Sequence, residues 1–326
     1  MITIFTNSTD PYFNLAAEEY FLYNSTEDIF MLWQNDKAAI IGKNQNVYAE
    51  INTEYARKNN ITIVRRITGG GAVYHDLGNV NYTFITSREK AGTLNFEYFT
   101  SPVISALKEH NINSELSGRN DILCDGAKVS GNAQFSTDTR VLHHGTLLFD
   151  SDLSVMPHLL TVAPEKIRSK SIKSVRSRVT NIKPLFADSN ITVQNFMDIV
   201  CDYVTRMYNA KKHGITEEER NLINEIRGKY VTHSWTFPAK YTYDCCTRKY
   251  GAYGLVEVNY SVKQGVIKQI SFFGDFFGTR DICEMESLLC GVHHNETEVQ
   301  KAIENIEINE YISKMTKSEF IKLLFE

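Results

Sequence analysis

The chain has 326 residues, of which 42% are hydrophobic and 23% are charged, a composition typical of soluble globular proteins that argues against a disordered chain. A chain of this length favours about two domains over a single core. The formal net charge of −4 gives no overall attraction for nucleic acid or for an anionic membrane, so we predict neither as a partner.

The first part of the chain alternates between helical and strand patterns. Helix formers that follow Asp10-Pro11 predict a helix over residues 15–22, and apolar runs predict buried strands over residues 29–33 and 38–42. Residues 50–60 predict a second helix that ends in an Asn-Asn pair, and residues 61–64 predict the next strand. Three consecutive glycines follow, so a glycine loop begins where this strand ends.

Further strands and one helix follow the glycine loop. Residues 82–86 alternate with period two, as a half-buried strand does. Ser101-Pro102 provides a capping hydroxyl and a first-turn proline, which predicts that a helix begins there. Residues 127–131 and 145–149 predict two more strands.

A second, smaller unit is predicted to begin near Pro238, after a lysine- and glutamate-rich stretch at residues 211–227 that indicates a solvated helix. Residues 255–270 predict a β-hairpin. The sequence from Thr316 to Glu319 is a capping box before a final helix. We therefore predict two domains, residues 1–238 and 239–326, the second of them a small α+β domain.

The chain contains six cysteines, none of them in a C-x-x-C spacing, which indicates reduced thiols rather than a disulfide framework. Four residues of zinc-ligand type cluster near the carboxyl end, namely Cys283, Cys290, His293 and His294. Their spacing fits no standard zinc pattern, so buried thiols and surface imidazoles are the preferred interpretation. No apolar run approaches the roughly 18 residues that span a bilayer. Residues 1–7 show no signal sequence, so we expect a cytoplasmic protein.

The segment of residues 65–79, RRITGGGAVYHDLGN, is the most informative part of the chain. Three glycines in a row are tolerated best where the main chain must come close to something else. Bare N–H groups beside two arginines suit a phosphate or a carboxylate, with a tight structural turn as the alternative. The segment matches neither the GxxxxGK(S/T) phosphate loop nor the dinucleotide fingerprint, which disfavours the two commonest nucleotide folds.

Residues 65–79 resemble the signature of lipoate-protein ligases. Five further segments agree with that family in order, namely residues 33–35 with 41–46, 118–122, 128–134, 143–148 and 174–181. The resemblance covers nearly all of the first predicted domain, and a small terminal domain is also the family's arrangement. It implies an α/β (α+β) fold with a mixed-sheet catalytic domain similar to biotin ligases and class II aminoacyl-tRNA synthetases, not a doubly wound parallel sheet.

The same resemblance implies a reaction in two steps. ATP and lipoate would give lipoyl-adenylate and pyrophosphate, and an acceptor lysine would then attack the mixed anhydride. ATP and Mg²⁺ are the implied cofactors, and lipoate is the implied substrate. The implied partners are lipoyl-domain proteins, namely the E2 subunits of 2-oxoacid dehydrogenases and the glycine cleavage H protein.

The family match also assigns roles to single residues. Lys128 is the expected catalytic residue, which contacts both nucleotide and lipoyl groups, because a compact point charge can serve two anions. The residues expected to bind ATP or lipoyl-adenylate are Arg66, Thr68, Gly71, Ala72, Val73, Tyr74, Asn79, Asn120, Asp121 and Lys128. Asp121 is also the candidate Mg²⁺ ligand. The candidates for the lipoyl pocket are Trp33, Ile41, Gly70 and His144, with Val73 and Tyr74 as further lining.

Two other features have a proposed role beside the site. His75 and His144 are interpreted as structural or ligand-orienting, because adenylation of a carboxylate needs no general base. Residues 166–178 contain six basic side chains and no acidic one. We hypothesise that this segment orders over the adenylate, although a charge run is more often a solvated face.

Three other functions stay open. An octanoyltransferase would form a cysteine thioester without ATP, and Cys124 is the cysteine closest to Lys128, although a buried small hydrophobe is its preferred interpretation. A biotin ligase would share the fold but would carry an arginine- and glycine-rich loop that is not visible here. A non-catalytic binder of lipoylated domains would have no reason to retain Arg66, the glycines and Lys128 together.

Overall fold

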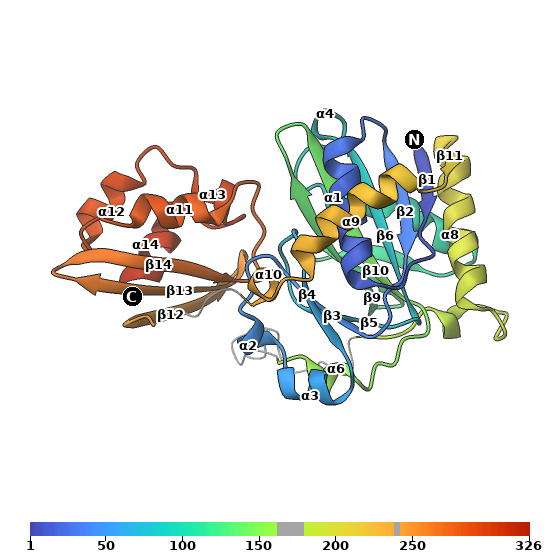
Figure 1. The fold of residues 1–326 in the computed structure, drawn as a ribbon, viewed down its shortest axis with the longest axis horizontal. Coiled ribbons are helices and arrows are strands. Elements are labelled where there is room, and N and C mark those ends of the chain that lie inside the picture. Colours follow the sequence, from blue (N-terminus) through green and yellow to red (C-terminus); the bar gives the residue numbers. More distant parts are fainter. Residues whose placement is uncertain (162–178, 238–241) are drawn as a thin grey trace.

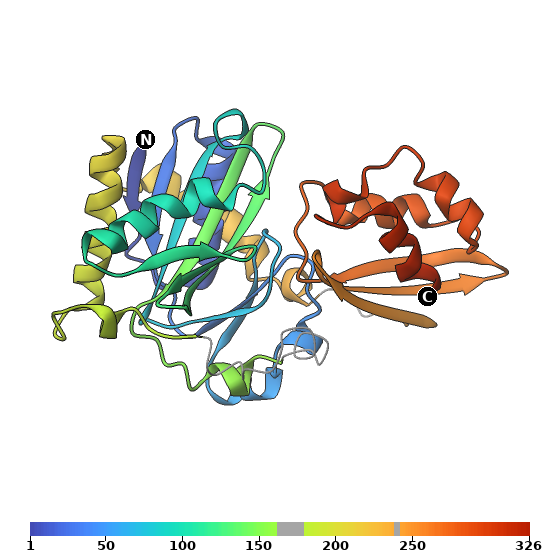
Figure 2. The same cartoon turned by 180° about the vertical axis from the view of Figure 1, so that it is seen from behind.

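The computed structural model describes residues 1–161, 179–237 and 242–326. Figures 1 and 2 show a larger amino-terminal body and a smaller carboxyl-terminal one beside it. The predicted domain boundary at residue 238 and the basic segment at residues 166–178 lie outside the described residues. Both therefore stay predictions.

An eight-stranded mixed sheet forms the centre of the larger body, in the order β11-β1-β2-β6-β10-β9-β8-β7. Its strands are β1 (Ile2–Phe5), β2 (Ile29–Trp33), β6 (Asn79–Ser87), β7 (Ser114–Ser117), β8 (Asp121–Cys124), β9 (Ala127–Ser136), β10 (Arg140–Leu148) and β11 (Lys211–His213). β1 pairs parallel with both β2 and β11, and the other neighbours pair antiparallel. The expected mixed sheet is therefore confirmed.

Helices cover both faces of this sheet (Figures 1 and 2). The helices α1 (Pro11–Asn24) and α9 (Glu217–Tyr230) pack on the face to which Met31 of β2 contributes, and α5 (Phe96–Glu109) and α8 (Val193–Tyr208) pack on the face of Phe30. Because successive side chains of a strand point to opposite faces, a strand covered on both sides becomes a continuous apolar run. This explains the sequence Ile-Phe-Met-Leu-Trp of β2, which is buried throughout.

A second, three-stranded sheet carries the glycine loop. It has the order β4-β3-β5 and consists of β3 (Ala38–Ile41), β4 (Thr62–Arg65) and β5 (Val73–His75). The loop joins β4 to β5, as the sequence predicts for its start. Short helices lie around the two sheets: α2 (Val47–Glu50), α3 (Thr53–Lys58), α4 (Arg88–Ala91), α6 (Met156–Leu159), η2 (Lys183–Leu185) and α10 (His233–Thr236).

The continuous helix predicted over residues 50–60 is wrong. The segment forms the separate helices α2 and α3, and the side chains of Asn46 and Asn52 each cap one of them. Ile51 between them has extended dihedrals and forms a β-bridge with Leu160. Asparagine side chains satisfy free N–H groups at helix starts, so two asparagines six residues apart favour two short helices.

The helix predicted to start at Ser101-Pro102 begins earlier, after the capping residue Asn95. Pro102 lies inside α5, where it cannot donate to the carbonyl of Tyr98. The hydroxyl of Ser101 donates to that carbonyl instead, at 3.3 Å. The Ser-Pro pair therefore lies inside a helix, where a side-chain hydrogen bond replaces the missing backbone one, and it does not mark a helix start.

The stretch 211–227 is only partly the predicted solvated helix. It begins with the edge strand β11, and the helix in it is α9.

The smaller body consists of a three-stranded sheet with helices on one face (Figure 2). The strands β12 (Cys245–Gly251), β13 (Gly254–Lys263) and β14 (Val266–Gly274) are antiparallel neighbours. The helices are α11 (Ile282–Leu289), α12 (Glu296–Ala302), α13 (Ile308–Tyr311) and α14 (Lys317–Phe325). The predicted hairpin is confirmed as β13 and β14, and the capping box at Thr316 and Glu319 is confirmed at the start of α14.

The expectation of buried thiols in the Cys283–His294 cluster is wrong, because Cys283 and Cys290 are both exposed. Cys283 lies in the first turn of α11, and Cys290 follows its last turn. Among the described residues, no three side chains of histidine, cysteine, aspartate or glutamate come together as a metal site would require. No helix within the described ranges is long and apolar enough to cross a membrane.

Candidate functional site

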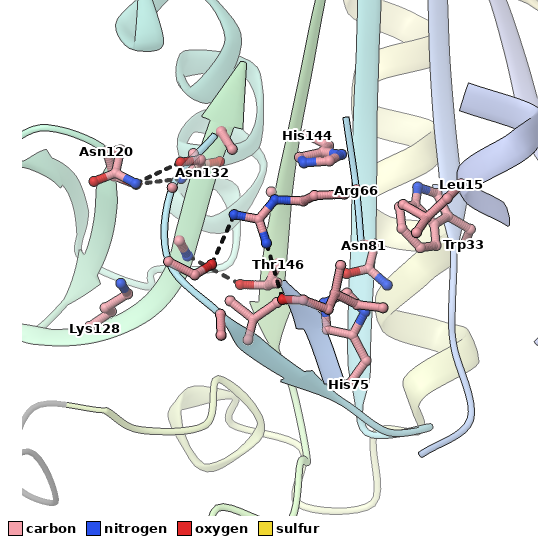
Figure 3. Close-up of a pocket in the computed structure, with 18 residues that line it drawn as sticks. Leu15, Trp33, Arg66, His75, Asn81, Asn120, Lys128, Asn132, His144 and Thr146 are labelled. Carbon is pink, nitrogen blue, oxygen red and sulfur yellow. Dashed lines mark hydrogen bonds between the residues drawn. The ribbon is translucent and has the colours of Figure 1, made fainter. Parts of the chain in front are cut away.

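A cavity of about 120 Å³ lies between the glycine loop and the central sheet. Its lining combines loop residues with side chains from α1, β2, β3, β5, β6, β9 and β10 (Figure 3). The predicted site residues that line it are Trp33, Arg66, Gly70, Gly71, Ala72, Val73, Asn120, Lys128 and His144. Residues far apart in the sequence therefore meet at one place, as the sequence analysis expects.

Strand alternation decides which neighbouring residues reach the cavity. Ile40 and not Ile41 lines it, and Val73 and His75 line it whereas Tyr74 does not. Ile41 and Tyr74 belong to an apolar cluster on the other face of the small sheet. A shift of one residue along a strand moves the side chain to the opposite face of the sheet. The expectation that the side chains of Ile41 and Tyr74 line the pocket is therefore wrong. Ile40 and His75 line it instead.

Asn79 lies outside the cavity. It is fully buried at the start of β6, and its Nδ2 donates to Oδ1 of Asn81 at 2.9 Å. Asn81 lines the cavity, two residues further along the same strand face. Sequence reasoning missed Asn81, although its period-two relation to Asn79 is a signal that was available.

Two buried donors at the cavity have no hydrogen-bond partner among the described residues. They are Nδ2 of Asn81 and Nε2 of His75. Nδ1 of His75 faces Nδ2 of Asn35 at 3.1 Å and so acts as the acceptor, which leaves the ring proton on Nε2. Burial lowers the pKa of His75 to about 3, so its ring is neutral at pH 7. Unpaired buried donors are rare, and these two suit an acceptor oxygen inside the cavity.

The buried guanidinium of Arg66 holds the glycine loop by hydrogen bonds to its carbonyls. Its side chain is only 5% exposed, and its Nη2 donates to the carbonyls of Gly69 at 2.6 Å and Gly71 at 2.8 Å. Nη1 donates to the carbonyl of Ile40 at 3.1 Å, and Nε donates to the hydroxyl of Thr68 at 2.8 Å. Burial lowers the pKa of Arg66 to about 10, which leaves it charged at pH 7. Arg66 therefore shapes the glycine loop, and its expected contact with a nucleotide stays a prediction.

The loop N–H groups remain free as a result. The carbonyls of Gly69 and Gly71 accept from Arg66, and within the described part of the chain the N–H groups of residues 69–72 have no hydrogen-bond partner. Successive free N–H groups in a turn form a concave site that favours anions. The loop therefore has the geometry of an anion site, as its composition suggests.

The three glycines serve different purposes. A Cβ on Gly69 would meet the carbonyl oxygen of Phe276 at 2.5 Å, so this glycine admits the small domain. Gly70 has φ of +87°, which side chains rarely adopt. A Cβ on Gly71 would meet nothing within 4 Å. Gly70 and Gly71 both line the cavity, but of the three glycines only Gly71 leaves room for a Cβ.

This difference predicts a contrast in stability between two alanine substitutions. We expect Gly70→Ala to lower the free energy of unfolding by roughly 1–2 kcal/mol, because it forces a Cβ into the left-handed region. Its Cβ would also meet Nη2 of Arg66 at 3.1 Å. Gly71→Ala should leave the free energy of unfolding unchanged. Urea unfolding of both variants measures the contrast, and equal stabilities would contradict this account of the loop.

Lys128 lies at the polar rim of the cavity (Figure 3). Its Nζ is 2.6 Å from Oδ1 of Asp121, and about a third of each side chain is exposed. The amide of Asn120, next to Asp121, donates to the carbonyl of Asn132 at 2.6 Å, and Nδ2 of Asn132 donates back to the carbonyl of Asn120 at 3.0 Å. This reciprocal pair fixes β8 against β9 beside Lys128. Asp121 itself does not line the cavity.

The small domain packs behind one wall of the cavity. Phe277 is 2% exposed and packs against Phe96 and Ala133, and Ala133 lines the cavity. The guanidinium of Arg119 stacks over the ring of Phe277 at 4.7 Å and donates to the carbonyl of Tyr253 at 2.9 Å. The turn before Asn120 is therefore held by the small domain, which sequence reasoning did not foresee.

The comparisons with known proteins identify one family over both bodies of the chain. Residues 10–205 match the family described as lipoyl protein ligase A/B catalytic domain, and residues 240–324 match the bacterial lipoate protein ligase C-terminus. The chain is 39% identical to lipoate-protein ligase LplJ of Bacillus subtilis, with 98% of each chain covered. It is 38% identical to lipoate–protein ligase 1 of Staphylococcus aureus, again with 98% of each covered.

Solved structures share the fold. The LipL1 protein of P. falciparum in complex with lipoate has a TM-score of 0.83 at 24% identity, covering 98% of this chain and 97% of that one. A bi-partite lipoate protein ligase from Thermoplasma acidophilum, described with its E2 lipoyl domain, has a TM-score of 0.65 at 25% identity, covering 75% and 98%. A lipoate-protein ligase A bound with ATP has a TM-score of 0.63 at 24% identity, covering 72% and 98%.

Proposed function

Since the chain belongs to the lipoate-protein ligase family, we propose that it activates lipoate with ATP and transfers the lipoyl group to a lysine of an acceptor protein. The observation that carries this proposal is one cavity with two chemically different ends. Trp33, Ile40 and Leu15 provide apolar surface, whereas Lys128, Asn120 and the free loop N–H groups provide polar contacts. A fatty carboxylate needs the first and a nucleotide phosphate needs the second.

In the first step a carboxylate oxygen of lipoate attacks the α-phosphorus of ATP, and pyrophosphate leaves. The two reacting groups are both anions, so they must be held together against their repulsion. We assign this role to Lys128, whose ammonium reaches the rim of the cavity, and to the loop N–H groups held open by Arg66. Fixed donors aimed at the developing charge stabilise it without reorganisation.

In the second step the neutral amine of an acceptor lysine attacks the acyl carbon of the mixed anhydride. The acyl–oxygen bond to AMP breaks, AMP leaves, and the amine gives up a proton as the amide forms. Lys128 can remain beside the phosphate of the departing AMP. The described residues around the cavity exclude bulk water from the acyl end, because Trp33 and Ile40 are both at most 2% exposed.

Mg²⁺ fits the polar rim as an ion that arrives with the nucleotide. It prefers oxygen ligands and is usually held by one or two carboxylates together with substrate phosphates. Asp121 supplies one carboxylate, at present paired with Lys128. We propose that Asp121 would hold the ion, which would supply positive charge to the phosphates, and that Lys128 contacts the reacting groups.

The acceptors are proposed to be lipoyl-domain proteins, namely E2 subunits of 2-oxoacid dehydrogenases and the glycine cleavage H protein. The support for this is the family and the Thermoplasma acidophilum structure described with its E2 lipoyl domain. The relatives from Bacillus subtilis and Staphylococcus aureus are bacterial proteins, and we propose a cytoplasmic location for this chain. We also propose residues 1–238 and 239–326 as the two domains, in line with the two matched families.

The test of the proposed function is lipoate-dependent exchange of labelled pyrophosphate into ATP. Pure protein with lipoate and Mg²⁺ should catalyse this exchange, and omission of lipoate should abolish it. The exchange reports adenylate formation alone, so it needs no acceptor protein. Absence of exchange would contradict the ligase proposal and would leave a non-catalytic binder as the better account.

A thioester mechanism makes a different prediction for Cys124. This thiol is 1% exposed, lies outside the cavity lining, and burial raises its pKa to about 11. Such a thiol is a poor nucleophile, which confirms the interpretation of a buried small hydrophobe. We expect Cys124→Ala to retain at least about half of the exchange and transfer activity, since a small core truncation costs little. Loss of transfer in a folded variant would favour the octanoyltransferase alternative.

A further inference from the structure

A buried carboxylate lies behind the cavity and takes no part in the proposed chemistry. Glu18 is on α1 and is 1% exposed. Its Oε1 accepts from the hydroxyl of Thr83 at 2.6 Å and from Nδ1 of His144 at 2.9 Å. A buried charge is costly unless it is paired and fully hydrogen-bonded. The chain keeps it nonetheless, directly behind two walls of the cavity.

The donors around Glu18 form an ordered chain from the glycine loop. Nε of Arg66 donates to Oγ1 of Thr68, so the Thr68 proton is free to point to Nε2 of His144, 2.9 Å away. With Nε2 as acceptor, Nδ1 of His144 carries the ring proton and donates it to Glu18. In this arrangement each donor along the chain from Arg66 through Thr68 and His144 to Glu18 has an acceptor. Figure 3 shows His144 beside the guanidinium of Arg66.

A second chain reaches the same carboxylate from the opposite wall. The indole Nε1 of Trp33 donates to Oγ1 of Thr83 at 2.8 Å, and Thr83 donates to Glu18. Trp33 lines the apolar end of the cavity, whereas Arg66 supports the loop that closes the polar side. Both walls are therefore fixed by hydrogen bonds that end on one side chain.

We propose that Glu18 is a positioning residue for adenylation, which holds Arg66 and the glycine loop through His144 and Thr68 and holds Trp33 through Thr83. This inference rests on the proposed function, because adenylation is its readout. The charge of Glu18 also raises the pKa of Arg66, against the burial that lowers it. A neutral amide at position 18 would lose this attraction and would present an NH₂ group to donors.

The test compares Glu18→Gln with a matched control on the same helix. Glu19 carries the same side chain one position further on, where it accepts from Nζ of Lys229 at 2.5 Å and from the hydroxyl of Tyr230 at 2.6 Å, away from the cavity. We expect Glu18→Gln to raise KM for ATP and lower kcat in pyrophosphate exchange, each by about tenfold, the effect of one lost charged hydrogen bond. Glu19→Gln should change neither by more than about twofold.

Measuring KM and kcat separately distinguishes a loss of positioning from a loss of folded protein. A variant that only unfolds more readily has fewer active molecules, which lowers apparent kcat and leaves KM for ATP unchanged. Direct titration of ATP by calorimetry checks the binding term without turnover. An unchanged KM and an unchanged dissociation constant for Glu18→Gln would overturn the proposal.

A second pair of variants tests the chain if Glu18→Gln does not fold. Thr68→Val keeps the shape of Thr68 and removes its hydroxyl, whereas Thr68→Ser keeps the hydroxyl. We expect Thr68→Val to raise KM for ATP and Thr68→Ser to restore it. An unchanged KM for ATP in Thr68→Val would overturn the proposal. Where Glu18→Gln does fold, adding Thr68→Val to it should change KM for ATP little further, because the chain is already broken. Fully additive effects would overturn the proposal, whereas failure of the wild-type protein to exchange pyrophosphate would instead refute the proposed function.

Discussion

Replacing Lys128 by alanine is expected to lower lipoate-dependent pyrophosphate exchange by roughly 10²–10³-fold, the usual effect of removing one preorganised donor to developing charge. The ammonium of Lys128 is the group at the polar rim that can approach both a carboxylate and an α-phosphate. Its side chain is a third exposed and, among the residues that the structure describes, forms an ion pair with Asp121, so the fold should not depend on it. Steady-state exchange together with a melting curve measures both effects.

Lys183 offers a matched control for this experiment. It forms a comparable ion pair, with Nζ at 2.7 Å from Asp150 and 32% of its side chain exposed, but it does not line the cavity. Lys183→Ala should therefore keep full exchange activity, as a surface ion pair contributes little. Lys128→Ala with exchange within about threefold of the wild type would refute the catalytic role assigned to Lys128.

Replacing Arg66 by lysine is expected to weaken ATP binding at least about tenfold, although the positive charge is kept. A guanidinium holds the carbonyls of Gly69, Gly71 and Ile40 and the hydroxyl of Thr68 at once. A single ammonium cannot reach all four, and each buried carbonyl left without a donor costs about 1–3 kcal/mol. The freed loop would then lose the arrangement that exposes its N–H groups. Calorimetric titration with ATP measures the loss.

The neighbouring Arg65 separates loop geometry from general stability. It is equally buried, at 6% exposure, and its guanidinium donates to five carbonyls, those of Gly42, Lys43, Gln45, Trp235 and Thr236. None of these carbonyls lies in the glycine loop. Arg65→Lys should lower the melting temperature at least as much as Arg66→Lys, while KM for ATP stays the same. If both variants weaken ATP binding equally, Arg66 has no special link to the loop.

Much of the fold follows from local sequence signals. Period-two alternation correctly predicts a strand at β6, although the expected half-burial is wrong because helices cover both faces of the sheet. An apolar run interrupted by a turn predicts the β13–β14 hairpin. Local signals predict the wrong element where another group supplies the hydrogen bond that the local pattern leaves out. The Ser101-Pro102 pair lies inside α5 because the hydroxyl of Ser101 replaces the missing donor, and residues 211–213 form a strand because β1 offers an open edge.

The sequence by itself determined the family, the reaction it implies and most of the residues that meet at the cavity. It could not decide which face of a strand lines that cavity, since β3 is buried on both faces and its pattern is apolar throughout. Ile40 therefore takes the place expected for Ile41, whereas Asn81 takes the place expected for Asn79 from two residues further along the same face of β6. Only the tertiary structure shows that Glu18 on the first helix accepts hydrogen bonds from Thr83 and His144 behind the cavity, because hydrogen bonds between residues 126 positions apart leave no local pattern.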